Sequence, residues 1–567
     1  MVRGGPIDVL TGDYLAELTM AILQRQRARG GTGYVGTFVR QMEEVLAECV
    51  AGGIKIVANA GGLDPEGLAS ALETLAARLG VAPRIAVVAG DDLMPRLGEL
   101  RAAGERFVHL DKGVPLGDLE PLTANAYLGG WPIAEALRRG ADVVITGRVT
   151  DAALVLGPAA WKFGWRRDDW DRLAGAVAAG HIIECSAQAT GGNYSFFDEV
   201  DWTRPLGFPI AEMHADGSFV ITKHAKTGGR VNVGTVTAQL LYEIDGPRYF
   251  NPDVVARFDT VQLVDEGGDR VRGSGTRGEP PPPTLKVALN HAGGFKNTMS
   301  VRIAGLDLDD KANLVEQLVA DASGGRDAFA EWHTSLRRPA QTGPDGPRDN
   351  EEAFALLSIT VKSPDARRVG KGWAAKVVEL SLSSVPGHSI THPPEDATPF
   401  LVYWPALVDA ARVEATVLLD GERTTVAPAT TTTAVRAPID ELLPPLLDAG
   451  ATVRAPLGRL FGARSGDKGG NANLGLWARS DEAWSWLANA LTVERMRALF
   501  PDLAPFTLER TLLPPLRAVH FTIRGLLGDG VAASTRSDPQ AKTLGEYVRA
   551  RIVELPASLV ASAMTPR

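Results

Sequence analysis

The chain has 567 residues, of which 45% are hydrophobic and 22% charged, and its net charge is −9. A chain of this length exceeds one hydrophobic core, so we expect roughly two to four domains of about 150 residues each. The acidic balance argues against a nucleic-acid partner, and only two cysteines, Cys49 and Cys185, exclude a disulfide scaffold and a cysteine-rich zinc site. No stretch approaches the roughly 20 apolar residues of a membrane span, and the N-terminus lacks a signal-peptide core, so we expect a cytoplasmic protein without a membrane partner.

The first third of the chain alternates apolar runs with helical patterns. Asp64-Pro65-Glu66 supplies a helix cap, a proline at the first helical position and a first-turn acid, and leucines at helical spacing continue to Leu79 before Gly80. Strands alternating with helices predict an α/β fold with a mostly parallel, Rossmann-like sheet and helices on both faces. The other predicted elements are strands at 54–58, 85–89, 107–110 and 142–145, and a helix at 132–139.

Several of these strands end in small or polar residues. Ligands of open parallel sheets bind outside the carboxyl ends of the strands, so we expect these residues to line one crevice. Each glycine or aspartate alone is equally typical of a strand-to-helix loop. Arg148 is the best candidate for an anion contact, because its planar guanidinium pairs bidentately with carboxylate or phosphate. The predicted crevice residues are Asn59, Gly61, Gly62, Asp91, Asp92, Thr146, Arg148 and Asp151, with Asp91, Asp92 and Asp151 as candidate catalytic carboxylates.

A second glycine-rich segment, Gly191-Gly192-Asn193, follows Cys185 and is a further candidate for substrate binding. The cysteine could be a nucleophile beside an oxyanion cradle, but its isoleucine neighbours favour a buried, inert thiol, and we expect it to be dispensable. His224 is a candidate catalytic base, with a surface-loop histidine as the alternative. The nine histidines show no ligand spacing, so no metal is expected. The run after residue 58 is not a G-x-G-x-x-G fingerprint, so a nicotinamide cofactor is unsupported.

Composition also suggests where the domains end. The Gly-, Pro- and Asp-rich segment Thr342–Asn350 is typical of a linker. We therefore predict an α/β catalytic or binding region at 1–345, a β-rich connecting region at 346–454 and a small α+β domain at 455–567. The predicted later elements are a strand at 357–362, a hairpin at 413–425 with its turn at Asp420-Gly421, a helix capped by Ser480, a strand at 519–523 and a closing helix at 544–553.

The segment from Arg464 to Asn473 lies between two apolar runs, 457–463 and 474–478, which are predicted as strands. Its three glycines let a loop fold tightly and turn several N–H groups to one side, and a lysine and an arginine add positive charge, as in an anion cradle. The alternative is a tight connection in which Asp467 and Lys468 pair with each other. The residues predicted to hold a phosphate or carboxylate are Arg464, Lys468, Gly469, Asn471 and Asn473.

Together, these motifs make the sequence similar to the acyclic terpene utilisation (AtuA) family over nearly its whole length. The matching runs are 13–20, 57–63, 90–93, 146–151, 190–193, 386–405 with Tyr403-Trp404, and 464–473. The resemblance implies a bacterial catabolic protein of citronellol- or geraniol-type isoprenoid degradation, with coenzyme A as part of a thioester substrate and a C-terminal ferredoxin-like domain. Relatives usually carry a further strand and helix before the segment that matches Asp13, whereas only residues 1–12 precede it here, which implies a misplaced start or a lost strand.

Three functions remain open from the sequence. The first is an enzyme that acts on a branched or isoprenoid acyl-CoA or carboxylic acid by hydratase, lyase or hydrolase chemistry. The second is a non-catalytic binding or scaffold subunit of an acyl-CoA pathway. The third, a nucleotide-dependent oxidoreductase, is weakened by the missing fingerprint. A symmetric homo-oligomer is the default expectation.

Overall fold

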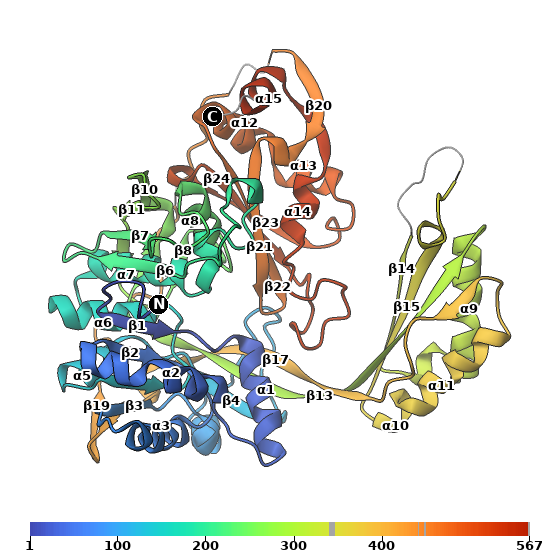
Figure 1. Cartoon of the computed structure of the whole chain (residues 1–567). Coiled ribbons are helices and arrows are strands. Elements are labelled where there is room, and N and C mark those ends of the chain that lie inside the picture. The colour runs from blue at the N-terminus through green and yellow to red at the C-terminus, as the bar shows by residue number, and fades with distance from the viewer. Residues whose placement is uncertain (339–345, 440, 447–449, 565–567) are drawn as a thin grey trace. The chain divides into compact units, whose positions relative to one another are not determined.

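The computed structural model describes residues 1–338, 346–439, 441–446 and 450–564. The chain divides into two compact units that do not follow its order (Figure 1). The larger unit comprises Met1–Asn290, Tyr403–Val531 and Asp538–Arg567, and the smaller unit comprises His291–Val402 and Ala532–Ser537. Residues 342–345 of the predicted linker at Thr342–Asn350, and with them the predicted domain end at residue 345, fall outside the described residues. No helix in the described ranges is long and apolar enough to cross a membrane.

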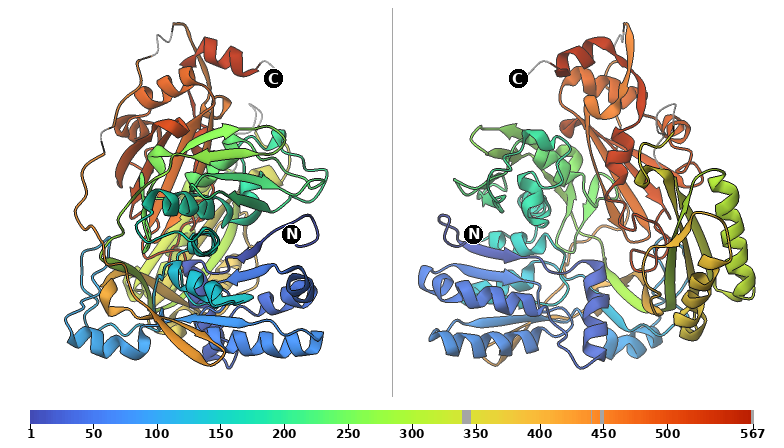
Figure 2. Two further views of the ribbon diagram at one scale, coloured as in Figure 1. Left: turned by 90° about the vertical axis from the view of Figure 1, so that its left-hand side faces the viewer. Right: turned by 45° about the vertical axis from the view of Figure 1, so that its right-hand side comes forward.

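The N-terminal part of the larger unit is built on a six-stranded sheet of order β1-β2-β5-β3-β18-β19, drawn mostly in blue in Figures 1 and 2. Its first four strands are parallel, and an antiparallel hairpin from much later in the chain completes it. The predicted α/β class is confirmed, but the sheet is mixed rather than clearly Rossmann-like. The strands are β1 (Val9–Gly12), β2 (Lys55–Ala58), β3 (Ile85–Ala89), β5 (Val143–Thr146), β18 (Ala415–Leu419) and β19 (Glu422–Val426).

Helices cover both faces of this sheet. Successive side chains of its strands point to opposite faces, and those on both faces are buried. Along β2, Ile56 packs against α2 and α3, whereas Val57 packs against α5 and α6. The predicted cap of α3 is confirmed, since Asp64 Oδ1 accepts a hydrogen bond from the Gly67 N–H at 2.9 Å. The helices of this layer are α1 (Glu17–Ala28), α2 (Gly36–Gly52), α3 (Pro65–Leu79), α4 (Leu97–Ala102), α5 (Trp131–Arg138) and α6 (Ala153–Phe163).

Two predicted elements are wrong. Residues 107–110 do not form a strand, because Phe107 has a φ of 44°, which lies outside the β region. The strand of this part of the chain is instead β4 (Thr123–Ala126), which pairs antiparallel with β13 (Thr284–Ala304). The predicted closing helix ends early as α14 (Leu544–Arg549), because the residues after it extend into a strand that pairs with residues 452–456.

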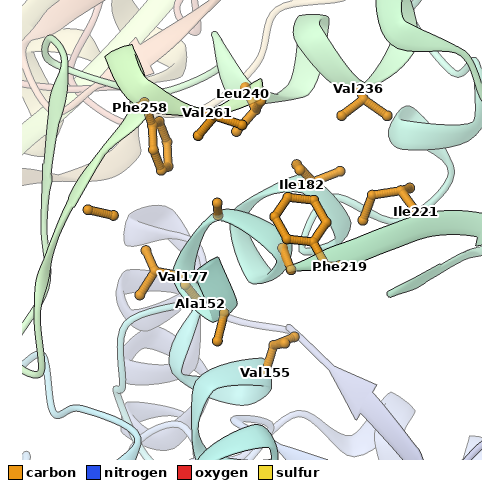
Figure 3. Close-up of a cluster of buried hydrophobic side chains, with 14 of the residues drawn as sticks. Ala152, Val155, Val177, Ile182, Phe219, Ile221, Val236, Leu240, Phe258 and Val261 are labelled. Carbon is orange, nitrogen blue, oxygen red and sulfur yellow. The ribbon is translucent and has the colours of Figure 1, made fainter. Parts of the chain in front are cut away.

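The largest apolar cluster surrounds α7 (Trp170–Ile183), in which every residue from Leu173 to Ile182 is buried. Figure 3 shows Val177 and Ile182 of this helix among side chains of the neighbouring elements. The surrounding elements are α8 (Val233–Leu240) and two small sheets, β10-β11-β7-β6 and β12-β9-β8. Their strands are β6 (Pro209–Met213), β7 (Phe219–Lys223), β8 (Arg248–Phe250), β9 (Val255–Arg257), β10 (Gln262–Asp265), β11 (Val271–Ser274) and β12 (Arg277–Glu279).

The C-terminal part of the larger unit is the predicted α+β domain, shown in orange and red in Figures 1 and 2. Its antiparallel sheet has the order β21-β22-β24-β23, and one face packs against α12, α13 and α14. The Ser480 cap is confirmed by its hydrogen bond from the Ala483 N–H at 3.2 Å. The elements are β20 (Thr452–Pro456), β21 (Phe461–Lys468), β22 (Asn471–Ala478), α12 (Asp481–Ala490), α13 (Val493–Leu499), β23 (Thr507–Leu513), β24 (Ala518–Arg524), β25 (Ile552–Pro556) and α15 (Ala557–Met564).

The segment from Arg464 to Asn473 is not the predicted glycine-rich loop. Strands β21 and β22 continue through it and pair as far as Lys468 and Asn471, so only Gly469-Gly470 forms the turn. Gly469 has a φ of 62°, which a glycine adopts without strain. The hydrogen bonds between β21 and β22 therefore use the backbone N–H groups that the predicted loop would have offered to an anion.

The other face of the C-terminal sheet packs against the end of α8, and two glycines allow this close contact. A Cβ at Gly466 would overlap the ring of Tyr242, and one at Gly475 would lie 2.7 Å from Leu241 Cβ. Asn473 joins the same two segments, because its side chain donates to the Leu241 carbonyl at 2.6 Å and accepts from the Glu243 N–H at 3.0 Å.

The smaller unit has one antiparallel sheet in which β14, β15, β13 and β16 lie in that order. Its helices α9, α10 and α11 supply side chains to a single apolar cluster with β13 and β15. The predicted strand at 357–362 is confirmed as part of β15. The elements are α9 (Leu308–Ala322), β14 (Glu331–Arg337), β15 (Phe354–Ser363), α10 (Ala366–Val369), α11 (Lys371–Glu379) and β16 (His388–Ile390), and the long strands β13 and β17 (Thr398–Asp409) belong in part to each unit.

We predict that Gly466→Ala destabilises the protein by about 1–3 kcal/mol, because the added methyl group meets a buried aromatic ring that cannot move away. The measurement is the unfolding midpoint in guanidinium chloride. Gly98→Ala is the matched control, since Gly98 lies in α4 with open space around its Cβ position and should cost nothing. Equal midpoints for Gly466→Ala and the wild type would contradict the proposed close contact.

Candidate functional site

Ionisable side chains from six separate segments of the larger unit interact electrostatically in one region, which we call the ionisable cluster. Asp13 follows β1, Arg148 and Asp151 follow β5, and Lys468 ends β21. The cluster contains four carboxylates and two cations, although the region is little exposed to solvent. The members of the cluster are Asp13, Arg148, Asp151, His181, Glu184, Glu243, Tyr249 and Lys468.

The carboxyl ends of the parallel strands meet at this cluster. Asn59, which follows β2, donates from Nδ2 to Asp13 Oδ1 at 2.6 Å and accepts from the Tyr14 N–H at 2.7 Å. Arg148 Nη1 donates to the carbonyl of Leu15. The ends of β1, β2 and β5 are thus held together by direct hydrogen bonds.

Asp91 and Thr146 form hydrogen bonds with the backbone around the turn that follows β5. Asp91 Oδ2 accepts from the backbone N–H of Arg148 at 2.8 Å and from Asn125 Nδ2 at 2.9 Å. The Thr146 carbonyl accepts from the Gly61 N–H at 3.1 Å. Asp91 is buried and accepts both hydrogen bonds through Oδ2, so it orients the turn that carries Arg148.

Other predicted residues lie elsewhere. Asp92 is exposed, and its carboxylate accepts from the Met94 N–H at 2.9 Å, which is a local turn interaction. His224 Nε2 lies 2.8 Å from the Met1 carbonyl, outside the cluster. Gly62 has a φ of 53° and faces Leu23, so it shapes the turn after β2 rather than the cluster.

Arg148 is the central cation. Its guanidinium is buried, pairs with Asp151 Oδ1 at 2.9 Å, and lies 4.2 Å above the ring of Tyr127. Its Nε has no hydrogen-bond partner among the described residues. A buried guanidinium with an unused N–H is suited to hold a further anion or a polarised carbonyl oxygen.

Glu184 is a nearly buried acid of the cluster, and its Oε1 lies 3.3 Å from Nδ1 of His181. Its side chain is 4% exposed, and its Oε2 has no hydrogen-bond partner in the described part of the chain. Burial, and then the carboxylates of Asp151 and Glu243, raise the pKa of Glu184 well above the usual range of a glutamate. Burial and Asp151 likewise raise the pKa of Asp13, and Arg148 opposes this shift.

Two aromatic groups complete the region. Burial, and then the nearby Lys468, lower the pKa of His181 to about 4, so its imidazole is neutral at pH 7. Its ring lies 4.8 Å from that of Tyr249, which is in turn 5.5 Å from Lys468 Nζ. Tyr249 therefore separates the histidine from the C-terminal domain's lysine and adds an apolar face.

The residues predicted from the 464–473 segment take different places. Lys468 belongs to the cluster, whereas Arg464 stacks on Tyr242 at 4.1 Å and donates to Gln188. Asn471 donates to Asp111 at 2.7 Å and accepts from the Gly525 N–H at 2.8 Å. Asn471, Asn473 and Gly469 therefore serve the packing of the domain in this structure.

The second glycine-rich segment lies beside a separate cavity. Gly191 has a φ of 109° and Asn193 of 58°, and Gly192 packs close to the Ala187 carbonyl. Asn193 lines the cavity, not the ionisable cluster. Burial, and then the Glu184 carboxylate, strongly raise the pKa of Cys185, which makes its thiol a poor nucleophile.

Sequence reasoning missed most of the acids of the cluster. His181 and Glu184 stand three residues apart at the end of α7, a spacing that places both on one helix face. That spacing was a usable signal. Glu243 and Tyr249 lie in a turn and a short strand, and nothing in their local sequence marks them.

Two family models match this chain. The model of the acyclic terpene utilisation family protein AtuA matches residues 1–419. The chain belongs to this family. The AtuA ferredoxin-like domain matches residues 455–554, so the cluster draws Lys468 from that domain and its other members from the first match. No curated protein and no solved structure matches the chain. Within the described ranges, no group of three or more His, Cys, Asp or Glu residues could hold a metal ion.

We predict a pH-dependent effect of Asp91→Asn. Burial raises the pKa of Asp91 from 3.8 to about 6, so the unfolded chain releases this proton first and the native state loses stability as the pH rises from 4 to 6. The loss approaches roughly 3 kcal/mol. Relative to the wild type, Asp91→Asn should therefore be more stable at pH 7.5 than at pH 4.5 in urea unfolding. The exposed Asp92→Asn is the control, and a pH-independent difference for Asp91→Asn would contradict the prediction.

We also predict that Cys185 is unreactive in the folded protein. In a Cys49→Ala background, which leaves one thiol, iodoacetamide at pH 7.5 should label the native protein far more slowly than the urea-unfolded protein. Mass spectrometry measures the labelled fraction. Rapid stoichiometric labelling of the native protein would instead indicate an activated thiolate.

Proposed function

We propose that this AtuA-family chain is an enzyme that transfers protons on a branched or isoprenoid acyl-CoA or carboxylic acid. Family membership supports the context of acyclic terpene utilisation. The observation that carries the proposal is Glu184, a nearly unexposed acid with an unused oxygen, in a cluster with a buried arginine. A strongly perturbed acid beside a specific charge partner is typical of an active site.

In the proposed reaction, Arg148 holds the oxygen of the substrate carboxylate or thioester carbonyl. Its Nε–H is unused, and its hydrogen bond to the Leu15 carbonyl and its ion pair with Asp151 hold the guanidinium in place. Charge that develops on the oxygen during addition to a conjugated double bond would be stabilised by this fixed cation.

The carboxyl groups supply the proton transfers. Glu184 keeps its proton to a higher pH than an ordinary glutamate, so it can act as the general acid. In a hydration, an ionised carboxylate of the cluster takes a proton from water, the resulting hydroxide adds to one carbon of the double bond, and Glu184 delivers a proton to the other. The reverse sequence is a lyase reaction. We favour this chemistry over attack by a protein nucleophile because the Cys185 thiol has a strongly raised pKa.

The experiment compares the wild type with Glu184→Gln on a panel of unsaturated branched acyl-CoA thioesters and the corresponding free acids. Mass spectrometry detects the gain or loss of one water. We expect Glu184→Gln to lower kcat by about 10²–10⁴ and to leave the thermal unfolding temperature unchanged or higher, because a buried acid is replaced by its neutral isostere. Asp92→Asn, an exposed acid at the end of β3, should keep full activity.

The other two functions give distinct results in the same experiment. Ligands that raise the unfolding temperature of the wild type without any turnover would show a binding or scaffold subunit. A rise with nicotinamide nucleotides alone would show a nucleotide-dependent oxidoreductase. Full activity of Glu184→Gln would remove the ionisable cluster from the mechanism.

A further inference from the structure

A cavity of about 1190 Å³ lies in the larger unit, and we call it the C-terminal cavity. It is bounded by the segment 193–199 after α7, by residues 458–465 and 479–483, and by α14 and α15. Ligand pockets usually measure roughly 300–1,000 Å³, so this one exceeds the need of a short branched acid.

The most buried charged residue that lines this cavity is Arg464, which is 6% exposed. No described carboxylate lies within ion-pair distance of its guanidinium, which stacks on Tyr242 and donates to Gln188. A buried cation without a counter-ion is costly, and a bound anion would compensate it. The fold therefore holds a positive charge at the inner wall of an open cavity.

The other charged groups lie nearer to solvent and largely neutralise each other. Arg479 pairs with Glu199 at 2.6 Å, and Arg549 pairs with Glu546 at 2.7 Å. The remaining lining charges are all exposed: Arg459 and Lys542 as cations, Asp198 and Glu482 as anions. The uncompensated positive charge is thus concentrated at Arg464, and the Nζ of Lys542 approaches the same Tyr242 ring at 5.9 Å.

An aromatic side chain also faces the cavity. Phe197 is 66% exposed, although it is fully apolar, and lies on the same segment as Asn193. An exposed ring in a cavity that is also lined by cations is suited to a ligand that combines a planar base with phosphates.

Arg464 lines the cavity and also interacts electrostatically with a member of the ionisable cluster. Its electrostatic neighbours on the inner side are Tyr242, Cys185 and Glu243, and Glu243 belongs to the cluster. A long ligand could therefore place its charged end in the cavity and its reactive end at the cluster.

We infer that the C-terminal cavity binds the phosphate-bearing nucleotide of a thioester substrate, with Arg464 as the inner anion contact and Lys542 at the entrance. This inference rests on the proposed function, and it selects the coenzyme A thioester over the free acid as the substrate.

The test is titration calorimetry of the whole protein with coenzyme A, adenosine 3′,5′-bisphosphate, pantetheine and inorganic phosphate. Coenzyme A and the bisphosphate should bind, and pantetheine and inorganic phosphate should bind at least tenfold more weakly. Arg464→Gln and Lys542→Gln should each weaken coenzyme A binding at least fivefold. Arg495→Gln is the control, since Arg495 is exposed on α13 and does not line the cavity.

Failure of the inference and of the proposed function can be told apart. If Arg464→Gln does not fold, the test relies on Lys542→Gln, since Lys542 is exposed. An unchanged affinity of Lys542→Gln for coenzyme A would overturn the inference. Pantetheine binding as tightly as coenzyme A would also overturn it, while hydration by the wild type would leave the proposed function standing. Nucleotide binding that depends on Arg464 without any turnover would support the inference and refute the proposed function.

Discussion

The contact between the C-terminal hairpin and the end of α8 is the constraint on which the functional region depends. Gly466 and Gly475 let the strands approach Tyr242 and Leu241 without a Cβ in between. Asn473 then ties the backbone on both sides of Tyr242 to the sheet. Arg464 consequently stacks on Tyr242, and Lys468, four residues along the same strand, belongs to the ionisable cluster.

This arrangement forces acids together in a region of low exposure. Arg148 and Lys468 do not balance the four carboxylates of the cluster, so burial and mutual repulsion raise the pKa of Glu184 and Asp13. Such groups reduce stability relative to an apolar core, and the large apolar cluster around α7 compensates for them. The presence of these acids despite the stability that they cost is consistent with a chemical role for them.

Much of the local structure could be predicted from sequence because its causes are local. The Asp64 cap and the hairpin turn at Asp420-Gly421 follow from side-chain hydrogen bonding and positive φ, and both are confirmed. It was also predictable that residues after neighbouring parallel strands would lie at one edge of the sheet. Asn59 and Arg148 both form hydrogen bonds there with the segment that follows β1. The same rule could not separate Asp91 from Asp92, because adjacent residues of an extended chain point in opposite directions.

The sequence by itself determined the family, the α/β class, several helices and strands, and the choice of Arg148 and Lys468 as candidate residues. It did so because caps, turns, periodicity and motif order are properties of short segments. Only the tertiary structure decided that Asp13, Glu184, Glu243 and Lys468 interact, since they come from segments far apart in the chain. It also decided that the glycines of the 464–473 segment serve close packing, because the space around a Cβ position depends on residues such as Tyr242 that lie more than two hundred positions away in the chain.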